Sequence, residues 1–452
     1  MFKNPEKLIF AFSCVVLLVG AAFIFGAYSG QRENAAFLAL RDLRNTADTL
    51  LTERGDDPVH FLQPARHQGS GVITNTPPDD GMLIFVSGFF DGGNEMRLMQ
   101  RDGTVVARWP VRFSEHFPDP SFLPQPPQSD WNVDLHGALV NPDGSVVFNY
   151  EYSGSVKLSP CGDVLWTLEH PTHHSVETAE NGGYWIPGRS FLRPKARDTL
   201  FPHLMRMRGR GMVEDDLILK VSEDGEILLE KSVSALLFEN GLEPLMTATG
   251  ESIMSNKTWD RELVHLNKIG ELPGNIADAF VGFDAGDLVL SLRKYNLVLM
   301  VDPNSWRVKW HQTGPWRRQH DPEFNADGTL TVFNNNTYRT STLGGSSDKV
   351  DPKAPLVSNI IKTDPAAGTN IVVYGARAGE TFGTVVRGKH EITPEGGYLV
   401  TEFEAGRIFE TNAAGKITWE YLNRYDADRV AEVTEARMYP RTYFTRAEWS
   451  CP

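Results

Sequence analysis

The chain has 452 residues and a formal net charge of −14, with 40 glycines and 28 prolines spread along it. This length is sufficient for one large domain. Lysine and arginine form no run that could follow a phosphate backbone, which excludes nucleic acid as an expected partner. No dinucleotide-binding, P-loop or serine-hydrolase motif occurs. The frequent turn residues favour short β-strands over a helical protein.

An apolar segment without charged side chains covers residues 8–28. About 21 helical residues span the roughly 30 Å hydrocarbon core of a membrane. Lys3 and Lys7 precede the segment, so the positive-inside rule keeps the N-terminus in the cytoplasm and places the remainder of the chain across the membrane. We therefore predict a transmembrane anchor over residues 1–30. A cleaved signal peptide is the alternative interpretation.

Two further regions follow the apolar segment. Residues 31–66 have mixed charge and a helical pattern, which predicts a helical stalk or linker. From residue 67 the pattern changes to short alternating apolar runs separated by Asp-Gly, Asn-Gly and Pro-Asp-Gly turns. Such runs are typical of β-hairpins. The sequence thus predicts an all-β domain over residues 67–452.

One unit recurs within this region: a glycine turn followed by a strand that ends in a bulky residue. Repeats of this kind, about 40 to 60 residues apart, are typical of the blades of a β-propeller. We predict a β-propeller with about six or seven four-stranded blades. The seven candidate closing strands begin near Gly103, Gly162, Gly225, Gly270, Trp306, Gly368 and Gly415.

The chain has three cysteines, and Cys14 lies within the apolar segment. Cys161 and Cys451 remain in the part expected outside the cytoplasm. They would form a disulfide in an oxidising compartment, or stay as two free thiols.

Histidines recur at one position of the repeat, shortly before its first glycine turn. Equivalent residues of different blades map onto a ring around the centre of a propeller, so these side chains are expected to converge. A single histidine of this kind more often has a structural role. Because no carboxylate pattern accompanies the histidines, we predict no metal ion and no cofactor. The four histidines are His136, His174, His320 and His390.

Polar residues also recur where the second strand of a repeat ends. Arg293 occupies this position in LSLRKYN, and Asn335 occupies it in VFNNNTYR. An arginine near a histidine suits a sulfate- or phosphate-like anion, because guanidinium groups donate bidentate hydrogen bonds to oxyanions. Ordinary hydrogen bonding at loop ends is the alternative.

Over about residues 125–425 the chain resembles the bacterial arylsulfotransferases, PAPS-independent enzymes built on a β-propeller. Four blocks carry the resemblance: DLHGALVNPDGSVVF, HHSVETAENGGYWIPG, DLVLSLRKYNLVLMVDPNSWRVKW and QHDPEFNADGTLTVFNNN. The resemblance implies transfer of a sulfuryl group from a phenolic sulfate ester to a phenolic acceptor through a sulfohistidine. It matches His320 to the nucleophile, Arg293 to the supporting arginine and His174 to a further catalytic histidine. We predict substrate-binding roles for His136, His390 and Asn335.

The family also has a His-x-Asn pair ahead of the blade that carries the arginine. At residues 276–280 this chain reads IADAF, so we expect the pair to be missing. Two hypotheses therefore stand. The first is a sulfotransferase, and the second is a non-catalytic propeller that binds a ligand, a glycan or a membrane-protein partner.

The resemblance to a bacterial family also defines the expected location. It implies a single-pass protein of the cytoplasmic (inner) membrane, with the C-terminal domain in the periplasm. The expected partner is a small phenolic or sulfated molecule, and protein partners remain open.

Overall fold

The computed structural model describes residues 5–32, 61–76, 81–192, 213–247, 262–337, 357–446 and 448–451, with isolated positions between 37 and 47. The chain forms two compact units, one containing the N-terminal helix and the other containing the sheets. Each is described by itself. The stalk predicted over residues 31–66 lies largely outside the described residues.

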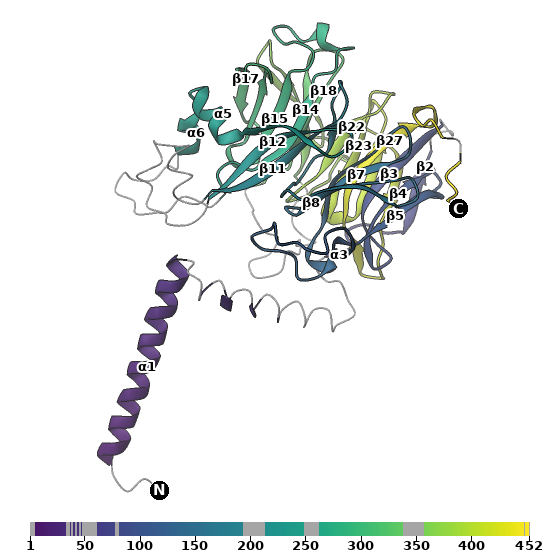
Figure 1. Cartoon of the computed structure of the whole chain (residues 1–452). Coiled ribbons are helices and arrows are strands. Elements are labelled where there is room, and N and C mark those ends of the chain that lie inside the picture. The colour runs from purple at the N-terminus through teal and green to yellow at the C-terminus, as the bar shows by residue number, and fades with distance from the viewer. Residues whose placement is uncertain are drawn as a thin grey trace. The chain divides into compact units, whose positions relative to one another are not determined.

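The N-terminal helix α1 spans Pro5–Arg32 and is the purple helix of Figure 1. Its segment from Glu6 to Gly30 is long enough to cross a membrane, and the most apolar 18-residue window within it has a mean hydropathy of 2.8. Nearly all of its apolar side chains are exposed. The helix predicted from the charge-free segment is confirmed, and its length and composition fit a single membrane span.

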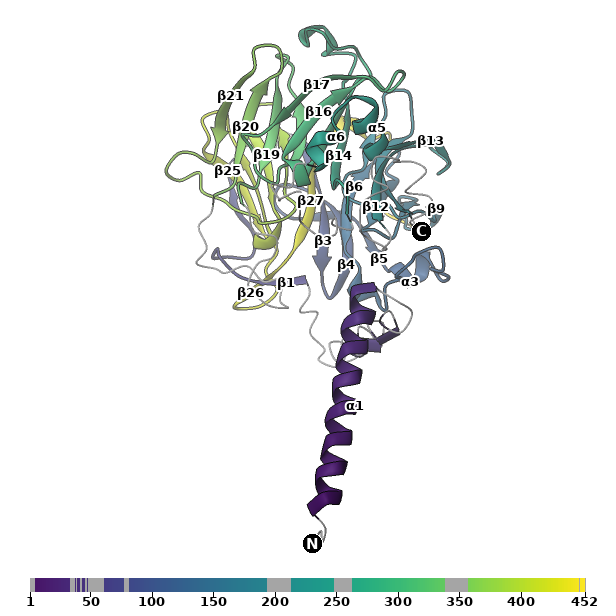
Figure 2. The same ribbon diagram turned by 90° about the vertical axis from the view of Figure 1, so that its left-hand side faces the viewer.

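The described part of the second unit contains six sheets of four or five strands and one two-stranded sheet. Innermost strands contact one another in the order β10, β14, β18, β22, β27 and β6. A closed series of this kind is a β-propeller with six blades, the smaller of the two numbers expected. Figure 1 and Figure 2 show the blades.

The strands of each blade follow from the inside outward. The first blade has β27 (Val433–Pro440), β3 (Met82–Phe90), β4 (Gly93–Met99) and β5 (Val105–Val111). The second has β6 (Leu135–Val140), β7 (Val146–Tyr150), β8 (Gly154–Leu158) and β9 (Val164–Leu168). The third has β10 (Glu177–Thr178), β11 (Tyr184–Leu192), β12 (Val213–Val221) and β13 (Ile227–Ser232).

The fourth blade has β14 (Leu266–Glu271), β15 (Leu288–Leu292), β16 (Leu297–Val301) and β17 (Val308–Thr313). The fifth has β18 (His320–Phe324), β19 (Leu330–Asn334), β20 (Asn359–Asp364) and β21 (Thr369–Tyr374). The sixth has β22 (Lys389–Ile392), β23 (Tyr398–Glu402), β24 (Arg407–Thr411), β25 (Ile417–Leu422) and β2 (Gly71–Asn75).

Short helices occur in the connections between strands. They are α3 (Phe113–His116), α5 (Val233–Glu239), α6 (Glu243–Thr247), η2 (Asp130–Asn132), η4 (Ala277–Ala279), η5 (Arg293–Tyr295), η6 (Phe403–Ala405) and η7 (Arg441–Tyr443).

Strands from both ends of the domain close the ring. The C-terminal strand β27 is the innermost strand of the first blade, while β2 adds a fifth strand to the sixth blade. In addition, β1 (Leu62–Pro64) pairs with β26 (Arg429–Ala431), and the Phe61 ring stacks on Phe89 at 4.3 Å. Strand β1 lies inside the range expected for the stalk. Pairing of both ends leaves few open sheet edges.

The structure also explains why the sequence suggested a seventh blade. Six of the seven candidate closing strands are the outer strands β5, β9, β13, β17, β21 and β25. The weak candidate near Gly270 belongs to β14, which is an innermost strand. An inner strand of similar composition was therefore counted as a closing strand.

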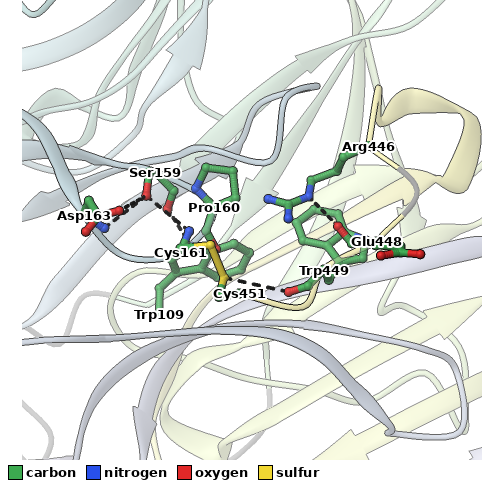
Figure 3. The surroundings of a disulfide bond; sticks show 9 residues. All are labelled: Trp109, Ser159, Pro160, Cys161, Asp163, Arg446, Glu448, Trp449 and Cys451. Carbon is green, nitrogen blue, oxygen red and sulfur yellow. Dashed lines mark hydrogen bonds between the residues drawn. A yellow bond between two sulfur atoms is a disulfide. The ribbon is translucent and has the colours of Figure 1, made fainter.

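A disulfide joins Cys161, in the turn between β8 and β9, to Cys451 near the C-terminus (Figure 3). Next to it, Trp449 packs against Trp109 of the first blade at 6.2 Å between ring centroids. The structure thus forms the bridge that the two cysteines allowed, and the bridge ties the segment after the closing strand to the second blade.

Candidate functional site

Three of the four predicted histidines gather where the innermost strands begin. The His174 ring lies 4.1 Å from the His136 ring and 6.2 Å from the His320 ring. His265 joins them, with its ring 4.9 Å from that of His174. We call these four residues the histidine cluster. All four are buried and come from four different blades.

Irregular backbone positions these side chains. The innermost strands β6, β14 and β18 each change register beside their histidine. Such bulges turn a side chain away from its regular direction and are frequent next to functional sites. His174 and His265 have positive φ angles of 55° and 68°. Gly137, at φ 79°, leaves space for the His174 carbonyl, which a Cβ atom would meet.

Asn335 determines which nitrogen of His320 carries the proton. The Asn335 Nδ2 donates to the backbone carbonyls of Thr384 at 3.0 Å and Arg387 at 2.8 Å, so its Oδ1 lies toward Nδ1 of His320, at 2.7 Å. An amide oxygen only accepts, so Nδ1 is protonated and Nε2 keeps the lone pair of a neutral ring. Nε2 is buried without a hydrogen-bond partner among the described residues.

A similar relay sets the tautomer of His174. The Nε2 of His173 donates to the carbonyl of Gly188 at 3.1 Å, and its Nδ1 lies 2.8 Å from Nδ1 of His174. When Nε2 carries the only ring proton of His173, its Nδ1 accepts, so His174 donates from Nδ1 and keeps the lone pair on its Nε2. Burial, followed by the neighbouring His136, holds the pKa of His174 well below its usual range.

His265 corrects one expectation from the sequence. The His-x-Asn pair is not missing, because His265 and Asn267 lie at the start of β14, ahead of the strand that ends at Arg293. The segment at 276–280 contains η4, which lies in the connection between β14 and β15. The connection between β14 and β15 lacks the short glycine turn of the other repeats. The search for a histidine shortly before such a turn therefore missed His265. The sequence VHLNK at residues 264–268, which contains His265 and Asn267, could have identified the pair.

Glu262 and Arg293 complete the surroundings of His265. Glu262 Oε1 accepts from Nδ1 of His265 at 2.7 Å, and Nη2 of Arg293 lies 3.2 Å from the same nitrogen. Burial alone would raise the pKa of Glu262, but the hydrogen bond from His265 lowers it to about 2. Glu262 is therefore a carboxylate, and Nε2 of His265 is the unprotonated nitrogen. Burial and then Arg293 lower the pKa of His265 to about 4.

The same effects keep His320 neutral. Burial and then the Arg293 guanidinium hold the pKa of His320 well below its usual range. Nε2 of His320 is therefore available as a nucleophile near neutral pH, while Arg293 provides a fixed positive charge. Thus His320, His174, Arg293 and Asn335 all lie in or beside the histidine cluster. Their predicted catalytic and substrate-binding roles remain predictions, as does that of His136.

His390 has a different environment. Its backbone nitrogen donates to Asp321 Oδ2 at 2.8 Å, and its ring lies near the Phe333 and Tyr398 rings. Asp321 in turn accepts from Lys268 at 2.9 Å. His390 therefore lies beside a group of buried charges, and its predicted substrate contact is not supported by a ring contact with the histidine cluster.

Two sets of side chains have metal-ligand chemistry, each with ligand atoms within 4.8 Å: His136, Glu151 and His174, and Glu177, Asp321 and Glu323. In the second set the Lys268 ammonium already bonds all three carboxylates. In the first set Glu151 pairs with Arg387. The absence of a metal and of a cofactor remains a prediction.

The fold and these residues define a class: a six-bladed propeller with buried neutral imidazoles and a guanidinium gathered where its inner strands begin. The family model described as Arylsulfotransferase (ASST) matches residues 137–424. This chain belongs to the arylsulfotransferase family, as the resemblance of its sequence blocks implied. A comparison with curated proteins gives no match.

Solved structures with a similar fold have low sequence identity. A protein of unknown function from Bacteroides caccae has 12% identity and a TM-score of 0.44, with coverage of 76% of this chain and 94% of that one. Virginiamycin B lyase from Staphylococcus aureus has 12% identity and a TM-score of 0.38, covering 81% and 88%. A nidogen/laminin complex chain has 9% identity and a TM-score of 0.42, covering 79% and 98%.

Proposed function

We propose that this arylsulfotransferase-family propeller transfers a sulfuryl group from a phenolic sulfate ester to a phenolic acceptor through His320. The observation that carries the proposal is the orientation of His320. Asn335 binds its Nδ1, and its buried Nε2 keeps a free lone pair within the histidine cluster.

In the first half of the reaction, Nε2 of His320 attacks sulfur and the ester S–O bond breaks. The phenoxide leaves with the bonding electron pair, and the sulfuryl group remains on Nε2. The ring then carries positive charge, which the Asn335 oxygen stabilises at Nδ1. Arg293 binds the sulfuryl oxygens during the transfer.

In the second half, an acceptor phenol attacks the sulfohistidine and must lose its proton. The unprotonated Nε2 atoms of His174 and His265 suit the role of general base. The base returns the proton to the next departing phenoxide, so the cycle is balanced. Such a two-step route predicts ping-pong kinetics.

The non-catalytic alternative rested on the expected absence of the His-x-Asn pair. Because His265 lies beside Arg293 and Asn267 follows two residues later, that reason no longer holds. Within the described residues no other observation favours a propeller that only binds a ligand, a glycan or a protein partner.

The direct test measures nitrophenol release from 4-nitrophenyl sulfate with phenol as acceptor, using the full chain in detergent. Wild type should release nitrophenol, and His320→Ala should not. His311→Ala is the matched control, since His311 is exposed on the outer strand β17. A sulfated peptide containing residue 320 should accumulate when the acceptor is omitted. Absence of release from folded wild type with several donors would refute the proposal.

We also propose that α1 anchors the chain in the cytoplasmic membrane with the propeller in the periplasm. The length and apolar composition of α1 support the anchor. The Cys161–Cys451 disulfide supports an oxidising compartment. Resistance to carbonate extraction, together with a bridge that is intact in cells before lysis, would test both parts. Recovery of a shortened, soluble chain would instead favour a cleaved signal peptide.

A further inference from the structure

The arginines around the histidine cluster fall into two groups. Those of the first group are paired with carboxylates: Arg189 with Asp216, Glu214 and Glu262, and Arg387 with Asp134 and Glu151. Arg293 and Arg318 form the second group. Among the described residues neither has a carboxylate within ion-pair distance. The second group therefore has positive charge without a bonded counter-ion.

The backbone places Arg318 beside the turn that carries Arg293. Asn296 ends this turn, and its Oδ1 accepts from the backbone nitrogen of Arg318 at 2.7 Å. The Asn296 carbonyl also accepts from the Trp316 indole at 2.7 Å. These bonds hold the segment just before His320 against the Arg293 turn. Arg318 is thus held beside the Arg293 turn, two residues before the nucleophile of the proposed reaction.

Arg318 has an unfavourable backbone conformation. Its φ angle is 55°, in the left-handed region that side chains other than glycine, asparagine and aspartate rarely adopt. Strain of this kind persists where surrounding contacts impose it and is concentrated at functional sites. The strained residue, Arg318, is two positions before His320 in the chain.

Each of the two guanidinium groups also has one nitrogen without a hydrogen-bond partner. The Nε atoms of Arg293 and Arg318 are buried without a partner in the described part of the chain. Burial, and then repulsion by Arg293, lower the pKa of Arg318 to about 10. Burial also lowers the pKa of Arg293. Removing a cation from water without an anionic partner is unfavourable, so an anion that contacts both groups would be stabilised.

We propose that Arg318 binds a second anionic group of the substrate, so that the site prefers aromatic sulfate esters that carry a ring carboxylate. This inference rests on the proposed function, in which Arg293 binds the sulfuryl oxygens. Arg318 is then the remaining cation beside Arg293 without a bonded carboxylate among the described residues. A planar carboxylate can accept two parallel N–H hydrogen bonds from a guanidinium. The preference would therefore come from charge attraction and from hydrogen-bond geometry.

The test compares 4-carboxyphenyl sulfate with its methyl ester as donors for the full chain in detergent. Wild type should favour the carboxylate donor in kcat/KM by about tenfold or more, the range of one charge-assisted bidentate contact. Arg318→Met should remove this preference, and Arg318→Lys should restore part of it. Arg317→Met is the control, because Arg317 is exposed and bonds Asn336. It should leave the preference unchanged.

Equal kcat/KM values for the two donors in wild type would overturn the proposal, as would an unchanged preference in Arg318→Met. If neither donor is turned over, calorimetry with 4-sulfobenzoate and its methyl ester separates the two proposals. Tighter binding of the dianion that is lost in Arg318→Met would support the anion site while the transfer reaction fails. Equal binding of both ligands would refute the anion site as well.

Discussion

The histidine cluster and a second group of buried and half-buried polar residues both come from the innermost strands or the residues just before them, but they differ in how their polar atoms are satisfied. We call the second group the charged cluster. It consists of Glu177, Lys268, Asp321, Glu323, Lys389 and Arg437. Lys268 alone bonds Glu177 at 2.7 Å, Asp321 at 2.9 Å and Glu323 at 2.6 Å. In the histidine cluster, by contrast, His265 and His320 each have a buried Nε2 without a partner.

This difference indicates a structural role for the charged cluster and a chemical role for the histidine cluster. Charges that bond one another at the centre of a ring hold neighbouring blades together and have little capacity left for a ligand. Neutral rings whose second nitrogen is unbonded are held in place at one end and remain reactive at the other. Position on an inner strand is therefore insufficient to identify a site, and it is the convergence of several unbonded ring nitrogens that distinguishes the histidine cluster from the charged cluster.

The largest expected effect is on turnover. Replacing His320 by alanine should lower kcat by at least about 1000-fold, because the nucleophile is lost. The free energy of unfolding of the His320→Ala variant should change by no more than about 1–2 kcal/mol, because loss of the imidazole leaves only the Asn335 oxygen without a hydrogen-bond donor. Nitrophenol release and urea unfolding measure the two quantities. A large loss of stability would show that His320 has a structural role like that of the charged cluster, and would contradict the distinction between the two clusters.

The converse change is Lys268→Met in the charged cluster. It removes the cation that bonds Glu177, Asp321 and Glu323, and we expect a loss of about 3–5 kcal/mol in the free energy of unfolding. The fraction that stays folded should keep the turnover of wild type, because Lys268 contacts no residue of the histidine cluster in the described structure. Urea unfolding and activity per folded molecule test this. A selective loss of kcat would show that the two clusters are coupled.

A smaller effect on turnover is expected for His265→Gln. If His265 is a general base, kcat should fall about 100-fold, with a steeper loss for acceptors of higher phenol pKa. Nitrophenol release with a series of acceptor phenols provides the measurement. A uniform loss across the series would assign His265 to positioning of Arg293, which lies 3.2 Å away. The matched control is again His311→Ala.

The disulfide lies outside both clusters and provides a stability control. Cys161→Ser should lower the free energy of unfolding by about 2–4 kcal/mol, because the bridge joins residues separated by 290 positions. Turnover at low temperature should not change. Cys14→Ser, in α1, should change neither quantity. If loss of the bridge lowered kcat, the closing strand β27 would also position the site.

The smallest effect on activity is its dependence on pH. Burial lowers the pKa of His265 in the folded state to about 4, below its value of about 6.5 in the unfolded chain. Its contribution to stability is therefore complete above about pH 6.5 and declines as the pH falls toward 4, by up to about 1.4 kcal/mol per unit. Activity should not decrease at pH 6.5, since His320 stays neutral there. A kcat/KM that halves near pH 6.5 would contradict this.

The sequence determined what depends on local pattern. Alternating strands and glycine turns indicated the propeller, and a charge-free segment indicated α1. Short sequence blocks such as QHDPEF indicated the family and singled out His320 as the candidate nucleophile. These features depend on neighbouring residues along the chain, because strand periodicity, turn chemistry and motif spacing are local properties.

Only the tertiary structure decided which residues meet across blades. It separated His390 from the histidine cluster and added His265, whose repeat has an irregular turn. It also showed that Asn335 orients His320 and that Arg318 has no carboxylate partner among the described residues. Bulges, tautomers and ion pairs of this kind depend on contacts between distant segments, and such contacts have no local trace in the sequence.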